Sequence, residues 1–253
     1  QEIVIADDAT EIDAYEFYGN ETHGAIVIPA SVKNIGRWAL AACKGISEVE
    51  IPASVTNIGA YAFSNNRALT NIVMHTGLST IQSAAFLNTG LHDAVIPDSV
   101  VSVGNCVFEY CYSLTNAVVG ESVSEMGQWV FDRCTNLASV VFRGDAPALE
   151  PDSDIYRFTK ASLVTYVPRG STGWDVPIPG VWQGRRIAYD GEAPLPLWIV
   201  VLDTQGGDAD ETTLHAVDGM AVGTLPTPTR TGYTFAGWYT AATGGSKVTA
   251  STK

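Results

Sequence analysis

Few side chains of this 253-residue chain have the types and spacing that catalysis or metal binding needs. The four cysteines include no CxxC pair and have no histidine at zinc-ligand spacing, so they form no recognisable metal site. The four histidines are scattered, and no HExxH, GxSxG, P-loop or dinucleotide fingerprint occurs. Asp152 with Asp154, or Asp208 with Asp210, would suit calcium, but neither pair has the full spacing of a calcium loop. The sequence therefore predicts a protein that is not an enzyme and needs no cofactor or metal.

The composition of the chain argues against some classes of binding partner. The chain has 27 acidic and 14 basic residues, a net charge of −13, which disfavours nucleic acid and anionic membranes because both require concentrated Lys and Arg. No apolar run approaches the roughly 18 residues that cross a bilayer, so we expect no membrane insertion. Only 16% of residues are charged, while 24 Gly and 12 Pro interrupt the apolar sequence, which favours short strands and tight turns. Since the sequence starts at Gln1 rather than Met, we expect a leader or further chain before it.

An internal repeat of about 23 residues explains this composition. The segment IPASVKNIGRWALAAC from Ile28 recurs as IPASVTNIGAYAFSNN from Ile51. A bulky position repeats with spacings of 22 or 23 at Phe17, Leu40, Phe63, Phe86, Phe108 and Phe131. An aliphatic position repeats with the same spacings at Ile12, Ile35, Ile58, Ile81, Val103 and Met126. One such unit cannot bury its own core, so the repeat predicts a solenoid whose coils stack on one another.

Each coil contains the signals of a short strand and a tight corner. In the segment from Leu69 to Met74 apolar residues alternate, as in a strand with one face turned inward. Proline ends several of these strands, and glycines such as Gly36 and Gly59 allow a corner that a side chain would obstruct. Successive strands should form a parallel sheet, so the sequence predicts a β-rich fold.

A column of small residues lies three positions after each bulky residue and should line the inner corner of the coils. Its members are Asn20, Cys43, Asn66, Thr89, Cys111 and Cys134. We expect these side chains to satisfy backbone groups of the turns. Cys111 and Cys134 would be one strand spacing apart, roughly 4.8 Å, which permits a disulfide. Their parallel side-chain directions favour stacked free thiols instead.

The unit LxxIxIPxSVxxIGxxAFxxC strongly resembles the BspA-like (Treponema-type, LRR_5) leucine-rich repeat. The resemblance covers about residues 1–143, and the segment to about residue 189 looks like the terminal part of such solenoids. It departs at His75 and Gly120, where the family has Pro, and at Gln82, where it has Gly. The resemblance implies a leucine-rich repeat solenoid, display in secreted or cell-surface form, and often adhesion or protein binding in bacteria.

Strand alternation names the residues that should face outward from the sheet. One row is mostly valine and a neighbouring row is polar, and together they form our predicted protein-binding face. Its members are Val27, Glu48, Glu50, Asn71, Val73, Asp93, Val95, Asn116, Val118, Ser139 and Val141. Contiguous exposed apolar surface suggests a partner. The alternative is that valine stands there because it is a good β former.

The repeat phase weakens after Arg143, so we expect an irregular cap from about residue 144 to the end of the solenoid near 190. An uncapped end would expose apolar core. Trp174, Trp182 and Tyr166 should belong to this cap. Alternatively, these aromatic side chains stack on a sugar.

The last segment, 197–253, reads as a second module. GTLPTPTRTGYTFAGWYT closely resembles the internalin B-type (Listeria-Bacteroides) repeat, which implies a small β-grasp-like fold. The matching residues are Leu225, Pro226, Pro228, Gly232, Tyr233, Phe235, Gly237, Trp238 and Tyr239. We expect Tyr233, Phe235, Trp238 and Tyr239 to supply most of a miniature core. Because the sequence stops at Lys253, before the strand that usually completes this repeat, we expect a truncated or weakly ordered module, unless a neighbouring chain supplies the missing strand.

Three functions fit these features. The first is a secreted or cell-surface protein that mediates adhesion or binds a host, bacterial or matrix protein through the sheet face. The second is a structural stalk or spacer that displays another domain. The third is carbohydrate binding through the aromatic cap.

Overall fold

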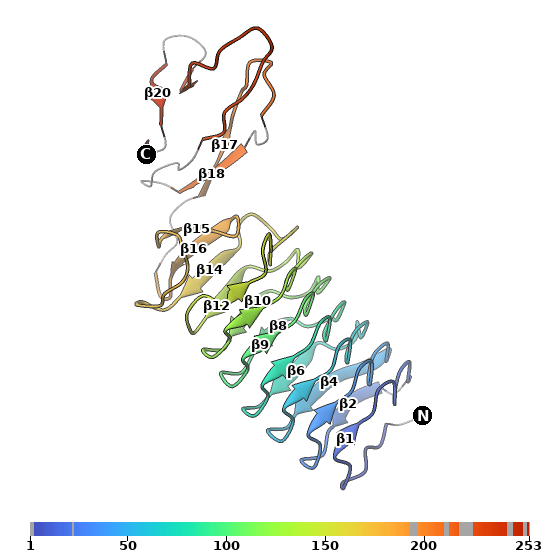
Figure 1. Ribbon diagram of the computed structural model, residues 1–253. Helices are drawn as coiled ribbons and strands as arrows, with labels where there is room; N and C mark the ends of the chain where they lie inside the picture. Colours follow the sequence, from blue (N-terminus) through green and yellow to red (C-terminus); the bar gives the residue numbers. More distant parts are fainter. Residues whose placement is uncertain are drawn as a thin grey trace.

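The computed structural model describes residues 3–21, 23–192, 197–209, 213–217, 225–241, 245–249 and 252. The described chain is rich in β structure and contains no helix, and residues up to the β15–β16 hairpin wind into a β-solenoid (Figure 1). This confirms the predicted fold class. Two short antiparallel pairs follow in the last segment.

Most coils contribute one strand to a main sheet face and one two-residue strand to a second sheet. The main face begins with a three-stranded sheet of β2 (His23–Val27), β4 (Gly45–Ile51) and β6 (Asn71–Met74). It continues as a six-stranded sheet of β8 (Asp93–Val95), β10 (Asn116–Val119), β12 (Ser139–Phe142), β14 (Val164–Val167), β15 (Gly180–Trp182) and β16 (Arg185–Tyr189). The second sheet consists of β1 (Glu11–Ile12), β3 (Asn34–Ile35), β5 (Asn57–Ile58), β7 (Thr80–Ile81), β9 (Ser102–Val103), β11 (Glu125–Met126) and β13 (Ala148–Leu149). All pairs are parallel except the β15–β16 hairpin.

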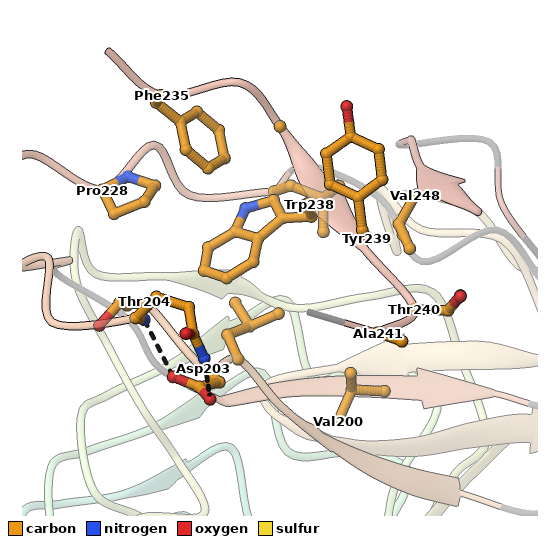
Figure 2. A pocket seen from close by; sticks show the side chains of 14 residues that line it. Val200, Asp203, Thr204, Pro228, Phe235, Trp238, Tyr239, Thr240, Ala241 and Val248 are labelled. Atoms are coloured by element: carbon orange, nitrogen blue, oxygen red, sulfur yellow. Dashed lines mark hydrogen bonds between the residues drawn. The ribbon is translucent and has the colours of Figure 1, made fainter. Parts of the chain in front are cut away.

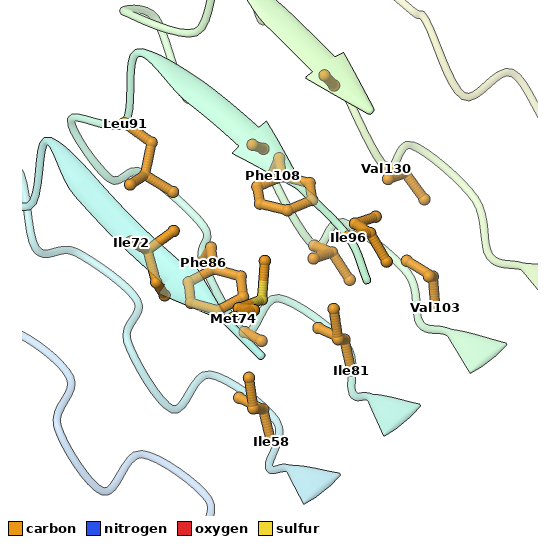
Figure 3. Close-up of a cluster of buried hydrophobic side chains, with 14 of the residues drawn as sticks. Ile58, Ile72, Met74, Ile81, Phe86, Leu91, Ile96, Val103, Phe108 and Val130 are labelled. Carbon is orange, nitrogen blue, oxygen red and sulfur yellow. The ribbon is translucent and has the colours of Figure 1, made fainter. Parts of the chain in front are cut away.

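The core is a stack of phenylalanine rings between the two sheets. Ring centroids are 5.4 Å apart for Phe63 and Phe86, 5.5 Å for Phe86 and Phe108, and 5.7 Å for Phe108 and Phe131. All four side chains are fully buried. Figure 3 shows Phe86 and Phe108 among the inward side chains of the main strands and of the two-residue strands. The repeated bulky position in the sequence is therefore this interior stack.

The main sheet is broken between β6 and β8, where a continuous sheet was expected. Leu69 follows Phe63 by six positions, but Leu91 follows Phe86 by only five, so the corner before β8 is one residue short. Gly90 lies in this corner, and a Cβ there would lie 2.3 Å from the carbonyl oxygen of Arg67. The shortened corner changes the approach of β8 to β6, so the two strands belong to separate sheets.

The departures from the repeat consensus are accommodated locally. At most coils the corner needs glycine: a Cβ on Gly59 would lie 2.7 Å from backbone atoms of the preceding coil. Gln82 stands at this position one coil later, and its amide donates to Asn57 Oδ1 (3.0 Å) while its oxygen accepts from the amide of Ala60 (3.2 Å). His75 replaces proline, and its backbone N–H donates to the carbonyl of Ile51 (3.2 Å), a bond that proline cannot form.

The column of small residues satisfies backbone groups in the corners, as expected. Cys43, Cys111 and Cys134 donate from Sγ to the carbonyls of Phe17, Phe86 and Phe108, at 3.1–3.2 Å. Asn66 donates to the carbonyl of Leu40 (2.8 Å) and accepts from the amide of Cys43 (2.7 Å). All four cysteines are free, which confirms stacked thiols rather than a disulfide.

These thiols should be unreactive in the folded protein. Burial raises the pKa of Cys111 to about 11, and burial together with Glu109 raises the pKa of Cys106 to about 12. Burial also raises the pKa of Cys43 and Cys134. Because only the thiolate is nucleophilic, we expect iodoacetamide at mildly alkaline pH to alkylate the folded chain far more slowly than the urea-unfolded chain, counted by intact mass.

The same pKa shifts make stability depend on pH. Unfolded thiols ionise above the ordinary pKa of 9.0, whereas the folded thiols keep their protons. The contribution is therefore fully present below pH 9.0 and is lost as the pH rises through the folded pKa values. Rapid alkylation of all four cysteines without unfolding would contradict this description.

Coil-like pairing continues beyond residue 144, within the segment that we expect to form the cap. Strand β14 pairs in parallel with β12, and the Tyr156 ring stacks on Phe131 at 6.1 Å. The cap itself contains the β15–β16 hairpin. Trp174 and Trp182 are only 3% and 8% exposed, with ring centroids 5.1 and 5.8 Å from Phe142. Their rings close the core, which leaves no face for stacking on a sugar.

The last segment contains β17 (Leu197–Val201) paired with β18 (Thr213–Val217), and β19 (Trp238–Tyr239) paired with β20 (Lys247–Val248). Trp238 is buried and donates from Nε1 to the carbonyl of Pro226 (2.8 Å). The expectation of a four-ring core is wrong, because Tyr233, Phe235 and Tyr239 are exposed. The division into residues 1–190 and 197–253, and the truncation of the second module, stay predictions.

Candidate functional site

The main sheet face carries a row of outward valines. Val27, Val73 and Val95 have exposed fractions of 80%, 41% and 48%, and Glu50 lies between Val27 and Val73 in the register. Further along, Val95 pairs with Val118, and Val118 pairs with Val141. Val118 and Val141 are half-buried. Parallel in-register pairing thus places the predicted valines on one face.

The neighbouring polar row is held by hydrogen bonds between coils. Asn71 donates from Nδ2 to Glu48 Oε1 (2.7 Å), and Asn116 donates from Nδ2 to Asp93 Oδ1 (3.0 Å). Ser139 donates to Asn116 Oδ1 (2.9 Å). These bonds fix the side chains before any partner binds, which lowers the entropy that binding would cost.

The structure divides the predicted residues into two groups at the break between β6 and β8. The three-stranded sheet carries Val27, Glu48, Glu50, Asn71 and Val73. The six-stranded sheet carries Asp93, Val95, Asn116, Val118, Ser139 and Val141. All eleven residues face the same side of the coils, but the hydrogen-bonded polar row is interrupted between Asn71 and Asp93.

Sequence reasoning missed three members of this face. His75 Nε2 lies 2.8 Å from Glu50 Oε1 at the edge of the first group. Tyr166 continues the valine row by pairing with Val141, and Arg186 continues the polar row through Val164. Apolar and outward residues alternate in LVTYVP, and this pattern could have identified Tyr166 as outward-facing. The spacing of the last coils is irregular, so the repeat does not predict that Arg186 faces outward.

A different side of the solenoid, which we call the turn face, carries exposed and half-buried aromatic residues that sequence reasoning did not select. It is formed by the segments around each interior bulky residue. Near the N-terminal end, the rings of Trp38 and Tyr61 stack at 4.3 Å, and Tyr15 stacks on Trp38 at 6.3 Å. All three residues have a positive φ near 60°, so their repeated backbone conformation aligns them. Tyr18 packs edge-on against Trp38.

A second group on the turn face alternates rings and guanidinium groups. We call it the arginine–aromatic ladder, and it consists of Tyr110, Trp129, Arg133, Arg157 and Phe158. Arg133 lies over Tyr110 and Phe158, and Arg157 lies over Trp129 and Phe158. The residue type at these positions changes from coil to coil, so no repeat signal marks them.

A hollow with a volume of about 640 Å³ lies in the last segment. Trp238, Phe235 and Val200 line it, as Figure 2 shows. Its single carboxylate, Asp203, accepts hydrogen bonds from the backbone and side chain of Gln205 (2.9 and 2.6 Å). Among the described residues that line the hollow, no His, Cys or Lys accompanies Asp203.

Other sites considered in the sequence also lack the needed geometry. Within the part of the chain that the structure describes, no three His, Cys, Asp or Glu side chains gather as a metal site. Asp154 instead accepts from the amide of Tyr156 (2.9 Å), and Asp210 lies outside the described residues. Among those same residues, no helix has the length and apolarity to span a membrane.

Comparison with solved structures gives relatives among bacterial repeat proteins. A leucine-rich repeat protein of T. pallidum is 32% identical over 52% of this chain and 62% of that chain, with a TM-score of 0.47. The pneumococcal vaccine antigen PcpA is 20% identical over 63% of this chain and 44% of that chain, with a TM-score of 0.51, a likeness that supports the fold alone. A leucine-rich cell surface protein from Faecalibacterium prausnitzii is 17% identical over 74% of this chain and 78% of that chain, with a TM-score of 0.37. The matched part spans less than two thirds of the first two relatives.

Family profiles match both parts of the sequence, although no curated protein matches it. The profile of the Listeria-Bacteroides repeat domain matches residues 199–253. Six copies of the BspA type leucine rich repeat region match residues 1–115 and 88–151. Proteins of this repeat type are bacterial surface proteins generally involved in protein interaction or adhesion, and the matched families are typically non-enzymatic. With more than half of its length matched by this repeat and a solenoid built from it, the chain belongs to the BspA type leucine-rich repeat family.

Proposed function

We propose that this protein is a non-enzymatic, secreted or cell-surface interaction protein that binds a protein partner through the main sheet face. The observation that carries the proposal is the exposure of Val27, Val73 and Val95 on one face of the solenoid, beside polar side chains already fixed by hydrogen bonds. Burying apolar side chains of this row would drive association, and the rigid polar row would provide specificity. A strand preference for valine explains the residue type but not the fixed polar row beside it.

The proposal predicts a large loss of binding when the valine row is charged. We expect the variant with Val73, Val95 and Val118 all changed to Lys to bind its partner about a hundredfold more weakly, because three buried apolar contacts become desolvated charges. Binding is measured against an immobilised panel of purified extracellular-matrix, host-surface and bacterial-surface proteins.

A matched control places the same three charges in the same coils but outside the sheet face. Ser79, Val101 and Ser124 lie one coil apart in exposed positions and are changed to Lys together. This control should bind like the unmodified chain. If the folded sheet-face variant keeps its affinity for the partner, the sheet face is not the site. A chain that binds nothing on the panel would instead act as a stalk or spacer.

A further inference from the structure

The arginine–aromatic ladder has a guanidinium group enclosed between two rings. Tyr110, Arg133 and Phe158 occupy equivalent positions in three consecutive coils, each with a positive φ near 60°. Arg133 Cζ lies 5.4 Å from the ring centroid of Tyr110 and 4.6 Å from that of Phe158. One ring comes from the preceding coil and the other from the following coil, so the rings cover the two faces of the planar guanidinium. The N–H groups at its edge remain for hydrogen bonding.

The second arginine of the ladder is already neutralised. Arg157 donates from Nη2 to Asp132 Oδ2 (2.9 Å), and the Asp132 side chain is fully buried. Arg157 Cζ also lies 4.7 Å from the ring centroid of Trp129 and 5.2 Å from that of Phe158. Arg157 and Arg133 therefore both contact the Phe158 ring, and these two contacts fix the exposed ring before any ligand binds.

Arg133 itself has no anionic partner. Within the described part of the chain, its guanidinium forms no ion pair, and its Nε is buried without a hydrogen-bond acceptor. By contrast, Arg143 and Arg169 pair with Asp98 and Glu192. In a chain of net charge −13, an arginine held in place yet left unpaired offers a local site for an anion.

The edge of a guanidinium matches a carboxylate, because two parallel N–H groups donate to its two oxygens. Two rings of this region are exposed: Phe158, over which Arg133 lies, is 58% exposed, and Tyr112, which packs edge-on against Tyr110 at 6.0 Å, is 48% exposed. Arginine, tyrosine and tryptophan are also the residues that contribute most to binding in protein interfaces. The ladder thus combines a preorganised carboxylate acceptor with an apolar rim.

We propose that the arginine–aromatic ladder is a second binding site, which takes an aspartate or glutamate side chain of a partner protein at Arg133 while an adjacent apolar side chain packs against the part of Phe158 that the two guanidinium groups leave exposed. A protein segment fits better than a sugar, since guanidinium groups already lie over the rings that a pyranose would need to stack on. The site lies on the turn face and uses none of the residues of the main sheet face.

The test titrates the intact chain into fluorescein-labelled peptides in which Glu alternates with Leu, followed by fluorescence anisotropy. The same peptides with Gln in place of Glu should bind at least about tenfold more weakly, because they cannot form the charged fork. Arg133→Gln should lose about tenfold or more in affinity for the acidic peptide. Arg133→Lys keeps the charge but lacks the planar fork, so it should also bind weakly.

Arg143→Gln removes the same charge at another exposed arginine and should bind like the unmodified chain. The melting temperatures of all variants distinguish a binding defect from unfolding. If Arg133→Gln does not fold, the affinity of Arg133→Lys for the acidic peptide tests the site instead. Equal affinity for acidic and neutral peptides, or unchanged affinity in a folded Arg133 variant, would overturn the proposal. If the chain binds only uronic-acid oligosaccharides, the proposal that the partner is a protein is wrong. Because other variants test the main sheet face, the proposal for one site can be disproved without affecting the proposal for the other.

Discussion

Replacing Phe86 with alanine should lower the free energy of unfolding by about 3–5 kcal/mol, one of the two largest effects we expect in this chain. The side chain is fully buried, with ring neighbours at 5.4 Å in the coil before and 5.5 Å in the coil after. Its removal leaves a cavity that rigid neighbouring strands cannot fill. Coils depend on their neighbours for stability, so the loss weakens two interfaces at once.

The position of Phe86 should also change how the chain unfolds. No main-sheet ladder joins β6 to β8, so the two coils are held together by the phenylalanine stack, the β7–β9 pair and backbone bonds between the turn segments, such as Phe86 N–H to the carbonyl of Val107 (3.0 Å). We expect the variant to show two transitions in urea, with amides of the N-terminal coils losing protection from hydrogen exchange first. Val101→Ala, at an exposed position of the next coil, should change stability by less than about 0.5 kcal/mol. If Phe86→Ala loses no more stability than Val101→Ala and unfolds in a single transition, the junction between β6 and β8 is not weak.

Replacing Trp182 with alanine should cost a similar amount, about 3–5 kcal/mol, and should also cause association. Its ring packs edge-on against Phe142 at 5.8 Å, Tyr156 at 6.0 Å and Trp174 at 5.0 Å. Without it, the last coil exposes its apolar interior to solvent, and such surfaces bind each other. Urea unfolding measures the stability change, and size-exclusion chromatography with light scattering measures the association.

Val181→Ala is the matched control for the cap, because Val181 lies on the same strand and points away from the core. It should remain monomeric and lose little stability. A Trp182→Ala chain that stays as stable and as monodisperse as this control would show that the cap does not protect the core.

The sequence predicted the interior of the solenoid well, because each interior position admits few residue types. The stack from Phe63 to Phe131 needs a large flat side chain in every coil, and the corner at Gly59 has no room for a Cβ. The free thiols also follow from the column that contains Cys111 and Cys134. These constraints repeat with the coil, so they leave a periodic pattern.

Features that occur once leave no such pattern. The break in the main sheet arises from one missing residue near Gly90, which shifts the spacing from 23 to 22 but does not reveal that hydrogen bonds are lost. The cap depends on contacts of Trp174 and Trp182 with residues far along the chain. The arginine–aromatic ladder uses half-buried and exposed positions of the turn face, where each coil has a different residue, and it becomes visible when Arg133 and its neighbours are stacked in space.

The break between β6 and β8 has a mechanical consequence for a molecule built as a rod. Bending stiffness along a stack of coils comes from hydrogen-bonded ladders on more than one side, because each ladder resists stretching when the rod curves. At this junction the second sheet continues from β7 to β9 and the turn face keeps its backbone bonds, such as Phe86 N–H to the carbonyl of Val107 (3.0 Å), while the main face has no ladder and resists least. Under a sideways force the rod will therefore flex here first, opening the main face and changing the angle between its two groups of outward residues.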